Sequence, residues 1–408
     1  MSIRTYSQNI SSNSKRQLKV VLVHDYLGEF GGAERVLEEL ARIWPKAPIY
    51  TSFYREGVAY ERFKNRKIIT SWAQKVPFFP TKLHSPLRFM APLIWNSFDF
   101  SGYDVVISSA SWYVTKGFKK KGNAVEICYC HTPPRYLYGY PTSINWQKYW
   151  PVRIYALIVN HFMRIYDFEA AQRVDYFVAN SENVRARIKK FYGRDAKVIY
   201  PPVFVNGLSS IDNRKKTIVD IRSHATINGL KRSAIDDYFL VVSRIVGAKG
   251  LQLAVEVANK LDLNLKIVGK PAGYAMEYKK IKSIAGENIE FLGFVSDSEL
   301  ARLYAGARAF LALATDEDFG MTPVEAMLAG TPVIAYAGGG YLETIVDGKT
   351  GVFFAEPDAR ALEEAVSKFT QLEGKGVFEP TYIKKHAQKF SKERFKREML
   401  KFVEEKIK

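Results

Sequence analysis

Short apolar runs alternate with helical stretches along most of the chain, and the alternation is interrupted once. In the first half, the runs that predict strands lie at residues 20–24, 103–109, 124–130, 176–179 and 197–200. In the second half, they lie at residues 239–243, 265–268, 289–292, 309–313 and 333–336. Strands that alternate with helices are typical of doubly wound parallel sheets. Because Pro201 and Pro202 stop the first series and a polar stretch follows, the sequence predicts two α/β domains separated by a cleft.

The same pattern sets the expected boundaries. Residues 1–17 are rich in Ser, Asn and Gln and lack the apolar core of a signal peptide, so we expect a mobile N-terminus. The first domain is expected at 18–203, a polar linker or insertion at 204–237, and the second domain at 238–385. A charged amphipathic helix is expected within residues 386–408. A length of 408 residues fits two to three domains.

The net charge of +18 is concentrated in the first half of the chain. Residues 1–200 contain 30 Lys and Arg against 15 Asp and Glu, whereas residues 201–408 contain 30 against 27. A basic half suits a polyanionic partner, which can be a nucleic acid, an anionic bilayer surface or a diphosphate-bearing substrate. The sequence contains no helix-turn-helix pattern, zinc-finger spacing or aromatic RNA-binding motif, so we expect no nucleic-acid partner.

Residues 62–100 mix cations with large apolar side chains, among them Trp72 and Trp95. That mixture is expected of an element lying in the headgroup layer of a membrane, although apolar residues at helical spacing also form protein cores. The sequence leaves both interpretations open. No apolar run approaches the roughly 20 residues that span a bilayer, so we expect a cytoplasmic protein, peripheral at the inner face of the cell membrane if this stretch contacts lipid. Cys128 and Cys130 are too few to form a four-ligand metal site and are expected to be core residues.

The stretch 315–340 carries the densest set of polar candidates. Glu317 and Gly320 follow a predicted buried strand, at the edge where open α/β sheets bind ligands. Thr322 is a predicted helix N-cap, and Glu325 lies three residues on, as in a capping box. The carboxylate of Glu325 can therefore serve the cap or a ligand. Two carboxylates beside a turn whose free amides attract anions point to a nucleotide-sugar site.

The sequence Glu-Asp-Phe-Gly-Met-Thr-Pro-Val-Glu at 317–325 resembles the retaining GT-B glycosyltransferases of the group 1 family. Further motifs in that family's order lie at 23–34, 129–133, 180–182, 243–250, 267–270, 291–296 and 343–351. The likeness covers residues 18–385. It implies an α/β GT-B fold, in which two Rossmann-like domains face each other across a deep cleft. The first domain would bind the acceptor and the second the donor, and the C-terminal helix would cross back onto the first domain.

Two cations are expected to hold the donor's phosphates. Arg244 and Lys249 follow the predicted strand 239–243, at the open end of the second sheet. Arg grips phosphate with two N–H groups, whereas Lys is a compact charge that can follow the charge developing on the leaving phosphate. Elsewhere an Arg and a Lys at this spacing would form a solvated surface, but at a strand end they favour a diphosphate site.

The resemblance implies further contacts in the second domain. Glu325 would bind the ribose diol, while Glu317 would bind a hydroxyl of the donor sugar and help to stabilise positive charge at the anomeric carbon. Val295 would meet the base through its main chain. The remaining donor contacts would be Gly269, Lys270 and the turn formed by Phe319, Gly320 and Met321.

In the first domain, the resemblance places His131 near the donor sugar, at the end of the predicted strand 124–130. Gly31 and Gly32 would close over the donor phosphates or the acceptor, or would merely form a turn before a helix. Asp25 is a further candidate for an acceptor contact.

The expected function is transfer of mannose from GDP-mannose to a saccharide or lipid-linked saccharide, with retention, because the motifs look most like mannosyltransferases of surface polysaccharide assembly. The leaving phosphate would take the acceptor's proton, since no activated nucleophile is evident. No metal or other cofactor is expected, because Arg244 and Lys249 would replace the metal, and the spacing of Asp316 and Asp318 only imitates a metal motif of another fold. The alternatives are a UDP-sugar enzyme, a sucrose- or glycogen-synthase-like enzyme, and a non-catalytic sugar-nucleotide-binding protein.

Overall fold

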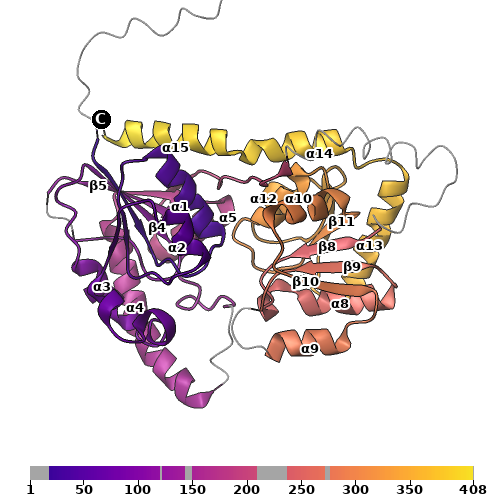
Figure 1. The fold of residues 1–408 in the computed structure, drawn as a ribbon, viewed down its shortest axis with the longest axis horizontal. Coiled ribbons are helices and arrows are strands. Elements are labelled where there is room, and N and C mark those ends of the chain that lie inside the picture. Colours follow the sequence, from indigo (N-terminus) through magenta and orange to yellow (C-terminus); the bar gives the residue numbers. More distant parts are fainter. Residues whose placement is uncertain (1–17, 120–121, 143–148, 209–236, 272–275, 408) are drawn as a thin grey trace, which may run out of the picture.

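The computed structural model describes residues 18–119, 122–142, 149–208, 237–271 and 276–407. It contains two parallel sheets, each in its own domain (Figure 1). The first sheet has the strand order β3-β2-β1-β4-β5-β6-β7, and the second has the order β10-β9-β8-β11-β12-β13. This is the expected α/β architecture. In each sheet the order reverses beside the first strand, and such a reversal creates a crevice at the carboxyl ends of the strands.

The strands of the first sheet are β1 Val20–His24, β2 Ile49–Thr51, β3 Ile68–Thr70, β4 Val105–Ala110, β5 Val125–Cys130, β6 Tyr176–Ala179 and β7 Ala196–Val198. Its helices are α1 Gly32–Ile43, α2 Val58–Phe63, α3 Ala91–Asn96, α4 Trp150–Arg173 and α5 Glu182–Tyr192. The strands of the second sheet are β8 Phe239–Val242, β9 Leu265–Val268, β10 Ile289–Gly293, β11 Ala309–Ala312, β12 Val333–Tyr336 and β13 Gly351–Phe354. Its helices are α8 Leu251–Lys260, α9 Met276–Ile284, α10 Asp297–Gly306, α11 Met321–Leu328, α12 Tyr341–Thr344 and α13 Ala359–Gly374.

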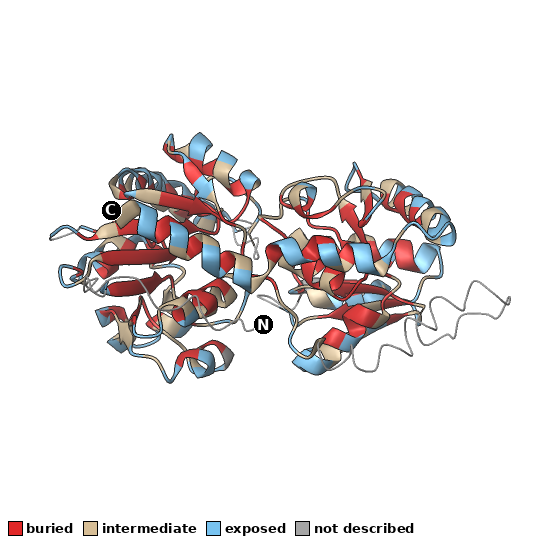
Figure 2. Ribbon diagram, turned by 90° about the horizontal axis from the view of Figure 1, so that it is seen from above, coloured by how far each residue is buried: buried red, intermediate tan, exposed pale blue. Residues whose placement is uncertain are grey.

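Strand β1 shows why the apolar runs are continuous. All five of its residues are buried. Leu22 packs into the core on one face of the sheet with α1, whereas Val21 and Val23 pack into the core on the other face. Helices cover both faces of a parallel sheet, so neither face of the strand needs polar side chains. Figure 2 shows the resulting buried interior in each domain.

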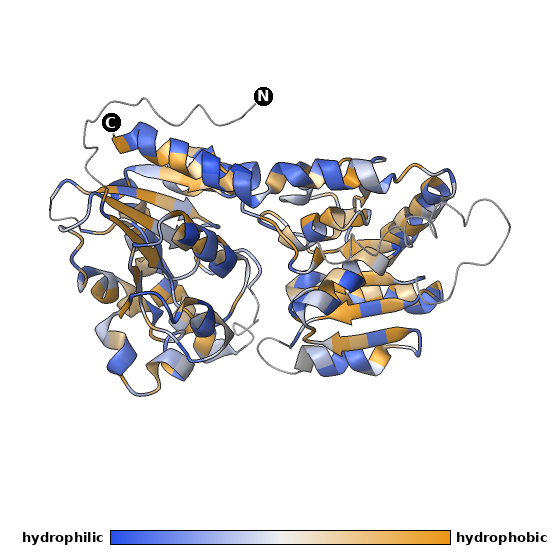
Figure 3. Ribbon diagram, turned by 45° about the horizontal axis from the view of Figure 1, so that its top comes forward, coloured by the Kyte–Doolittle hydropathy of each residue, from blue (hydrophilic) through white to orange (hydrophobic). Residues whose placement is uncertain are grey.

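The last helices join the two domains. Helix α14 (Pro380–Ala387) packs on α11, and α15 (Lys392–Ile407) runs on to α1 and β5 of the first domain (Figure 1). Phe395 and Met399 of α15 are buried in the first domain's core. Figure 3 shows polar and apolar residues alternating along this helix, as expected when only one of its faces is buried.

The structure differs from the sequence predictions at several places. Strands β2, β3 and β13 were not expected. Thr322 is not an N-cap, because α11 begins at Met321, and its N-cap is Gly320 in a left-handed conformation with φ 87°. The expected N-terminal segment 1–17 and most of the expected linker 204–237 lie outside the described residues.

The stretch 62–100 divides between core and surface. Trp95 is buried, whereas Trp72, Phe89 and Leu93 are exposed. The core interpretation therefore holds for Trp95, whereas membrane contact by the exposed residues stays a prediction. Cys128 and Cys130 are buried and free, as expected of core residues. Within the described ranges, no helix is long and apolar enough to cross a membrane.

Candidate active site

Residues predicted from scattered motifs meet at one edge of the second sheet. Arg244 follows β8, Gly269 follows β9, Val295 follows β10 and Glu317 follows β11. These four strands are neighbours and parallel, so their carboxyl ends share one edge. The predicted donor residues of the second domain therefore lie in the crevice that a doubly wound sheet offers to ligands.

Glu317 lies at the centre of this edge. Its Oε2 accepts a hydrogen bond from Lys249 Nζ at 2.6 Å and lies 3.5 Å from the Tyr341 hydroxyl. Burial alone would raise the pKa of Glu317, but Lys249, Arg135 and Arg244 outweigh it and hold that pKa below its usual value. The carboxylate is therefore negative at neutral pH and suited to a developing positive charge.

The two predicted phosphate cations differ in their surroundings. Lys249 is partly buried against Glu317, whereas the Arg244 side chain is 55% exposed. Arg244 Nη1 lies 3.5 Å from Glu29 Oε2 of the first domain. Lys249 is therefore fixed in place, and Arg244 is free to turn toward an anion entering between the domains.

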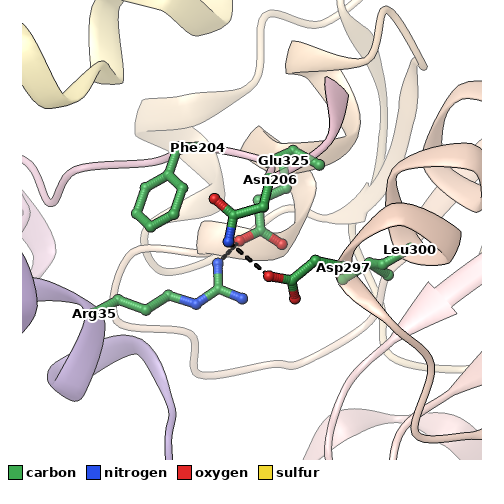
Figure 4. A pocket seen from close by; sticks show the side chains of 7 residues that line it. Arg35, Phe204, Asn206, Asp297, Leu300 and Glu325 are labelled. Carbon is green, nitrogen blue, oxygen red and sulfur yellow. Dashed lines mark hydrogen bonds and ion pairs between the residues drawn. The ribbon is translucent and has the colours of Figure 1, made fainter. Parts of the chain in front are cut away.

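Glu325 is not a capping residue. Its carboxylate is buried, accepts a hydrogen bond from the Tyr304 hydroxyl at 2.7 Å and forms an ion pair with Arg35 of α1. Figure 4 shows Arg35 reaching toward Glu325 across a small pocket that Asn206 and Asp297 also line. The capping interpretation was therefore wrong, and the carboxylate that was expected to bind ribose is paired with the first domain.

The turn after Glu317 is built for close packing. Phe319 is buried between the rings of Tyr200 and Phe390, so only its main chain can serve a ligand. A Cβ on Gly320 would lie 2.7 Å from the Tyr341 ring, and its φ of 87° also favours glycine. Glycine at this position lets the chain turn tightly before α11.

The two domains approach each other closely at the start of α1. A Cβ on Gly32 would lie 3.0 Å from Met321 Sδ at the start of α11, so glycine keeps this contact free of strain. The Gly31 amide donates to Glu34 Oε2 at 2.8 Å, so this amide already has a hydrogen-bond acceptor within the protein. Of the two predicted glycines, Gly32 is the one that faces the second domain.

His131 directly follows β5 and is buried in a hydrogen-bonded chain of side chains. Its Nε2 lies 2.8 Å from Ser109 Oγ, which in turn lies 3.1 Å from His24 Nδ1. His24 Nε2 continues the chain to Glu34 Oε1 at 3.4 Å. Burial, reinforced by His24, lowers the pKa of His131 to about 4, so the ring is neutral at pH 7. A neutral imidazole can donate or accept a hydrogen bond, but it does not supply a positive charge.

Asp25 has its hydrogen-bonding capacity filled by the protein. One carboxylate oxygen accepts from the Ser111 amide at 3.1 Å, the Ser111 hydroxyl at 2.7 Å and the Trp112 amide at 2.6 Å. The other oxygen accepts from Thr115. The geometry gives Asp25 a structural role, tying the end of β1 to the loop after β4.

Gly269 and Lys270 follow β9. A Cβ on Gly269 would lie 1.8 Å from the Ser243 carbonyl oxygen, so glycine is required for the strand ends to pass each other. The Lys270 ammonium lies 5.0 Å from the centre of the Phe294 ring. Gly269 therefore shapes the edge, and Lys270 adds positive charge beside it.

Sequence reasoning missed four charged residues that join the domains, here called the interdomain charge cluster: Arg135, Arg187, Asp316 and Asp318. Arg135 Nη2 donates to Asp318 Oδ1 at 2.8 Å, and Arg187 Nη1 donates to the same oxygen at 2.7 Å. Both arginines also pair with Asp316. The two aspartates flank Glu317, so the cluster fixes the segment that carries the central carboxylate.

Three further hydrogen bonds join the two domains beside this cluster. Ser181 Oγ donates to the Asp318 carbonyl at 2.6 Å, and the Glu182 and Asn183 amides donate to the Glu343 carboxylate at 2.7 and 2.8 Å. The position of Arg135, four residues after His131 in a strand-end loop, was the available signal in the sequence. Arg187 lies on α5, and nothing in the sequence distinguishes it from an exposed helical arginine.

Among the described residues, no group of three or more His, Cys, Asp or Glu is arranged to hold a metal ion. Asp316 and Asp318, whose spacing imitates a metal motif, are paired with arginines instead.

Two family descriptions match the chain. Residues 30–206 match "Glycosyltransferase Family 4", and residues 228–394 match "Glycosyl transferases group 1". The chain is 25% identical over 395 residues to an alpha-1,3/1,6-mannosyltransferase ALG2 of Dictyostelium discoideum, covering 87% of this chain and 90% of that one. It is 30% identical over 172 residues to a glycogen synthase of Thermodesulfovibrio yellowstonii, covering 41% and 34%.

Solved structures share the fold. The structure of Anabaena Alr3699/HepE in complex with UDP and glucose has a TM-score of 0.66 and 17% identity, and the match covers 95% of this chain and 99% of that one. Sucrose-phosphate synthase from Thermosynechococcus elongatus also has a TM-score of 0.66 and 17% identity, with 95% and 98% covered.

Proposed function

Because this chain belongs to the glycosyltransferases, with a family 4 domain followed by a group 1 domain, we propose that it transfers mannose from GDP-mannose to a saccharide or lipid-linked saccharide, with retention. The observation that carries the proposal is the Glu317 carboxylate, held negative by Lys249 at the carboxyl edge of the second sheet. The similarity to a mannosyltransferase along most of the chain supports mannose as the sugar.

The proposed chemistry assigns one task to each group. Lys249 and Arg244 stabilise the charge that collects on the leaving phosphate, and Glu317 stabilises the positive charge at the anomeric carbon. His131, neutral at pH 7, hydrogen-bonds a sugar hydroxyl. The leaving phosphate takes the acceptor's proton, which places attack and departure on the same face of the sugar.

Donor contacts along the rest of the edge complete the proposal. The amides of the 319–321 turn orient the sugar, Val295 meets the base through its main chain, and Gly269 and Lys270 line the approach. Glu325 binds the ribose diol, for which Arg35 must leave the carboxylate. Binding of nucleotide and release of Arg35 are therefore coupled.

We also propose that the reaction needs no divalent metal. The pairing of Asp316 and Asp318 with arginines supports this, because two carboxylates engaged in ion pairs are poor ligands for a further cation. Activity that survives EDTA would agree with the proposal, and activity restored only by added Mg²⁺ or Mn²⁺ would contradict it.

The second candidate is a UDP-sugar-dependent enzyme of the glycogen-synthase type. It is favoured by the partial similarity to a glycogen synthase and by the fold shared with a protein whose structure contains UDP and glucose. The basic first domain favours the membrane-associated acceptor instead, at an anionic membrane surface on the cytoplasmic side.

A panel of nucleotides separates these candidates. Thermal unfolding is measured with GDP, UDP and ADP, since a ligand that binds only the folded state raises the Tm. We expect GDP to give the largest rise, and incubation with GDP-mannose to release mannose slowly. A rise with UDP alone would select the second candidate, and no rise with any nucleotide would refute the donor site.

A further inference from the structure

Helix α4 has two apolar faces. One is buried in the first domain and includes Ala156, Met163 and Ala170. The opposite side, here called the outer face of α4, is formed by the exposed residues Ile154, Leu157, Ile158, Phe162, Ile165 and Phe168. Their spacing of three and four residues places them on one stripe. Leu157 is 71% and Phe162 65% exposed, so the first domain leaves this stripe uncovered.

The apolar surface continues beyond the helix. Phe89 and Leu93 on the neighbouring α3 segment are also exposed. A groove between the two elements is lined by Phe89, Pro92, Val159, Phe162, Met163 and Tyr166. Contiguous exposed apolar surface of this kind marks an interaction site in a folded protein.

The exposed charges of α4 up to Ala170 are two arginines and one glutamate. Arg153 and Arg164 flank the apolar stripe, and Glu169 follows Phe168 at its end. Asp167 is buried and paired with Lys116. The surface therefore combines an apolar stripe with two arginines, within a first domain, residues 18–203, that has 27 basic and 15 acidic residues.

We propose that the outer face of α4 docks on the surface of an anionic phospholipid bilayer. A helix of 24 residues is about 36 Å long, so it can lie in the membrane plane with its apolar stripe at the boundary of headgroups and acyl chains. Arg153 would meet lipid phosphates there. The inference deepens the proposed function and rests on it only in that a lipid-linked acceptor would be presented at the same surface.

A bilayer fits this face better than a second copy of the chain. A symmetric dimer through α4 would bring together two first domains, each with 27 basic and 15 acidic residues, and their net positive charges repel each other. An anionic surface attracts the same domain, pairs with Arg153 and Arg164 and also accepts the apolar stripe.

Co-sedimentation of the full chain with vesicles tests this proposal, using phosphatidylcholine alone or mixed with phosphatidylglycerol. The variant Leu157→Ser/Phe162→Ser is compared with Leu261→Ser/Tyr382→Ser, which makes matched changes at exposed apolar positions of the second domain. We expect the α4 variant to lose at least about tenfold in vesicle partitioning, because two apolar side chains no longer leave water. The control should partition as the wild type does, and Arg153→Gln should weaken binding at low salt only.

Two further measurements separate the possible failures. The α4 variant should keep the wild-type Tm, since both side chains are exposed, and it should still release sugar from the nucleotide-sugar donor. Fluorescence of Trp150, which is 72% exposed at the start of α4, should shift to the blue with anionic vesicles and not do so in Trp150→Phe. Vesicle binding unchanged in the α4 variant, or a wild-type dimer that the variant dissociates, would overturn the assignment to lipid. Absence of donor turnover in the wild type would refute the proposed function and would leave the membrane proposal standing.

Discussion

The interdomain charge cluster provides the sharpest test of how the site is held together. Arg187→Met removes a guanidinium that is only 5% exposed and that binds Thr132, Asp316 and Asp318. Methionine keeps much of the apolar stem, so the change isolates the charge. Removal of one partner from a buried ion pair costs about 3–5 kcal/mol when it leaves the other charge uncompensated. Here Arg135 still pairs with both aspartates, so we expect a loss of about 2–3 kcal/mol in the free energy of unfolding.

The matched control lies on the same helix. Arg185→Met breaks an ion pair with Asp195 in which both side chains are largely exposed, at 42% and 71%. Exposed pairs contribute little to stability, because water screens them. Urea unfolding of the two variants and the wild type therefore gives a direct comparison.

A double-mutant cycle with Asp318→Asn identifies the partner. Burial raises the pKa of Asp318 although Arg135 and Arg187 oppose it, so loss of Arg187 makes the remaining negative charge costlier. Asp318→Asn should then cost less in the Arg187→Met background than in the wild type, by about 1–3 kcal/mol. Because Glu317 lies between the two aspartates, turnover should fall as well. Additive effects, or a loss no greater than that of Arg185→Met, would show that the cluster does not hold this segment.

Three further predictions concern single groups. Lys249→Ala and Arg244→Ala should each lose about 2–4 kcal/mol of transition-state stabilisation, seen in kcat at saturating donor, and wild-type turnover would exclude that residue from the phosphate site. Glu325→Gln should weaken nucleotide binding, whereas Arg35→Ala should strengthen it by releasing the same carboxylate. Isothermal titration with the nucleotide checks that the two variants change the Kd in opposite directions. The pKa of His131 is depressed to about 4 in the fold, so its contribution of about 3 kcal/mol to the free energy of unfolding is complete above pH 6.5 and is lost as the pH falls toward 4. In His131→Phe the free energy of unfolding should therefore depend less on pH between 6.5 and 4. An unchanged pH dependence would contradict the burial of His131 as a neutral ring.

The predictable part of this protein was the part with a local pattern. Strand β1 was predicted with its correct bounds because four consecutive apolar residues lead into His24, and all five are buried. Strands β2 and β3 were missed because each has only three residues, too few to show a periodicity. The Thr322 cap failed because Gly320 caps the helix two residues earlier, in a left-handed conformation that a Thr-Pro pattern does not reveal.

The contacts of the site within the second domain could be predicted, whereas those between the two domains could not. Arg244, Lys249 and Glu317 could be placed together because each follows a strand, and parallel strand ends share an edge. The partner of Glu325 could not be found in this way, because Arg35 lies 290 residues earlier, on helix α1 of the first domain. Its approach depends on how the domains close, which no local pattern encodes.

The segment Asp316-Glu317-Asp318 explains why closure and chemistry are difficult to separate. The two aspartates pair with Arg135 and Arg187 of the first domain, while Glu317 between them pairs with Lys249 of its own domain. Neighbouring side chains of one short loop thus bind different domains. When the domains separate, Asp316 and Asp318 lose their partners, whereas Glu317 keeps its contacts with Lys249 and with the Gly340 amide of its own domain. The backbone around the central carboxylate consequently loses part of its restraint when the first domain moves away.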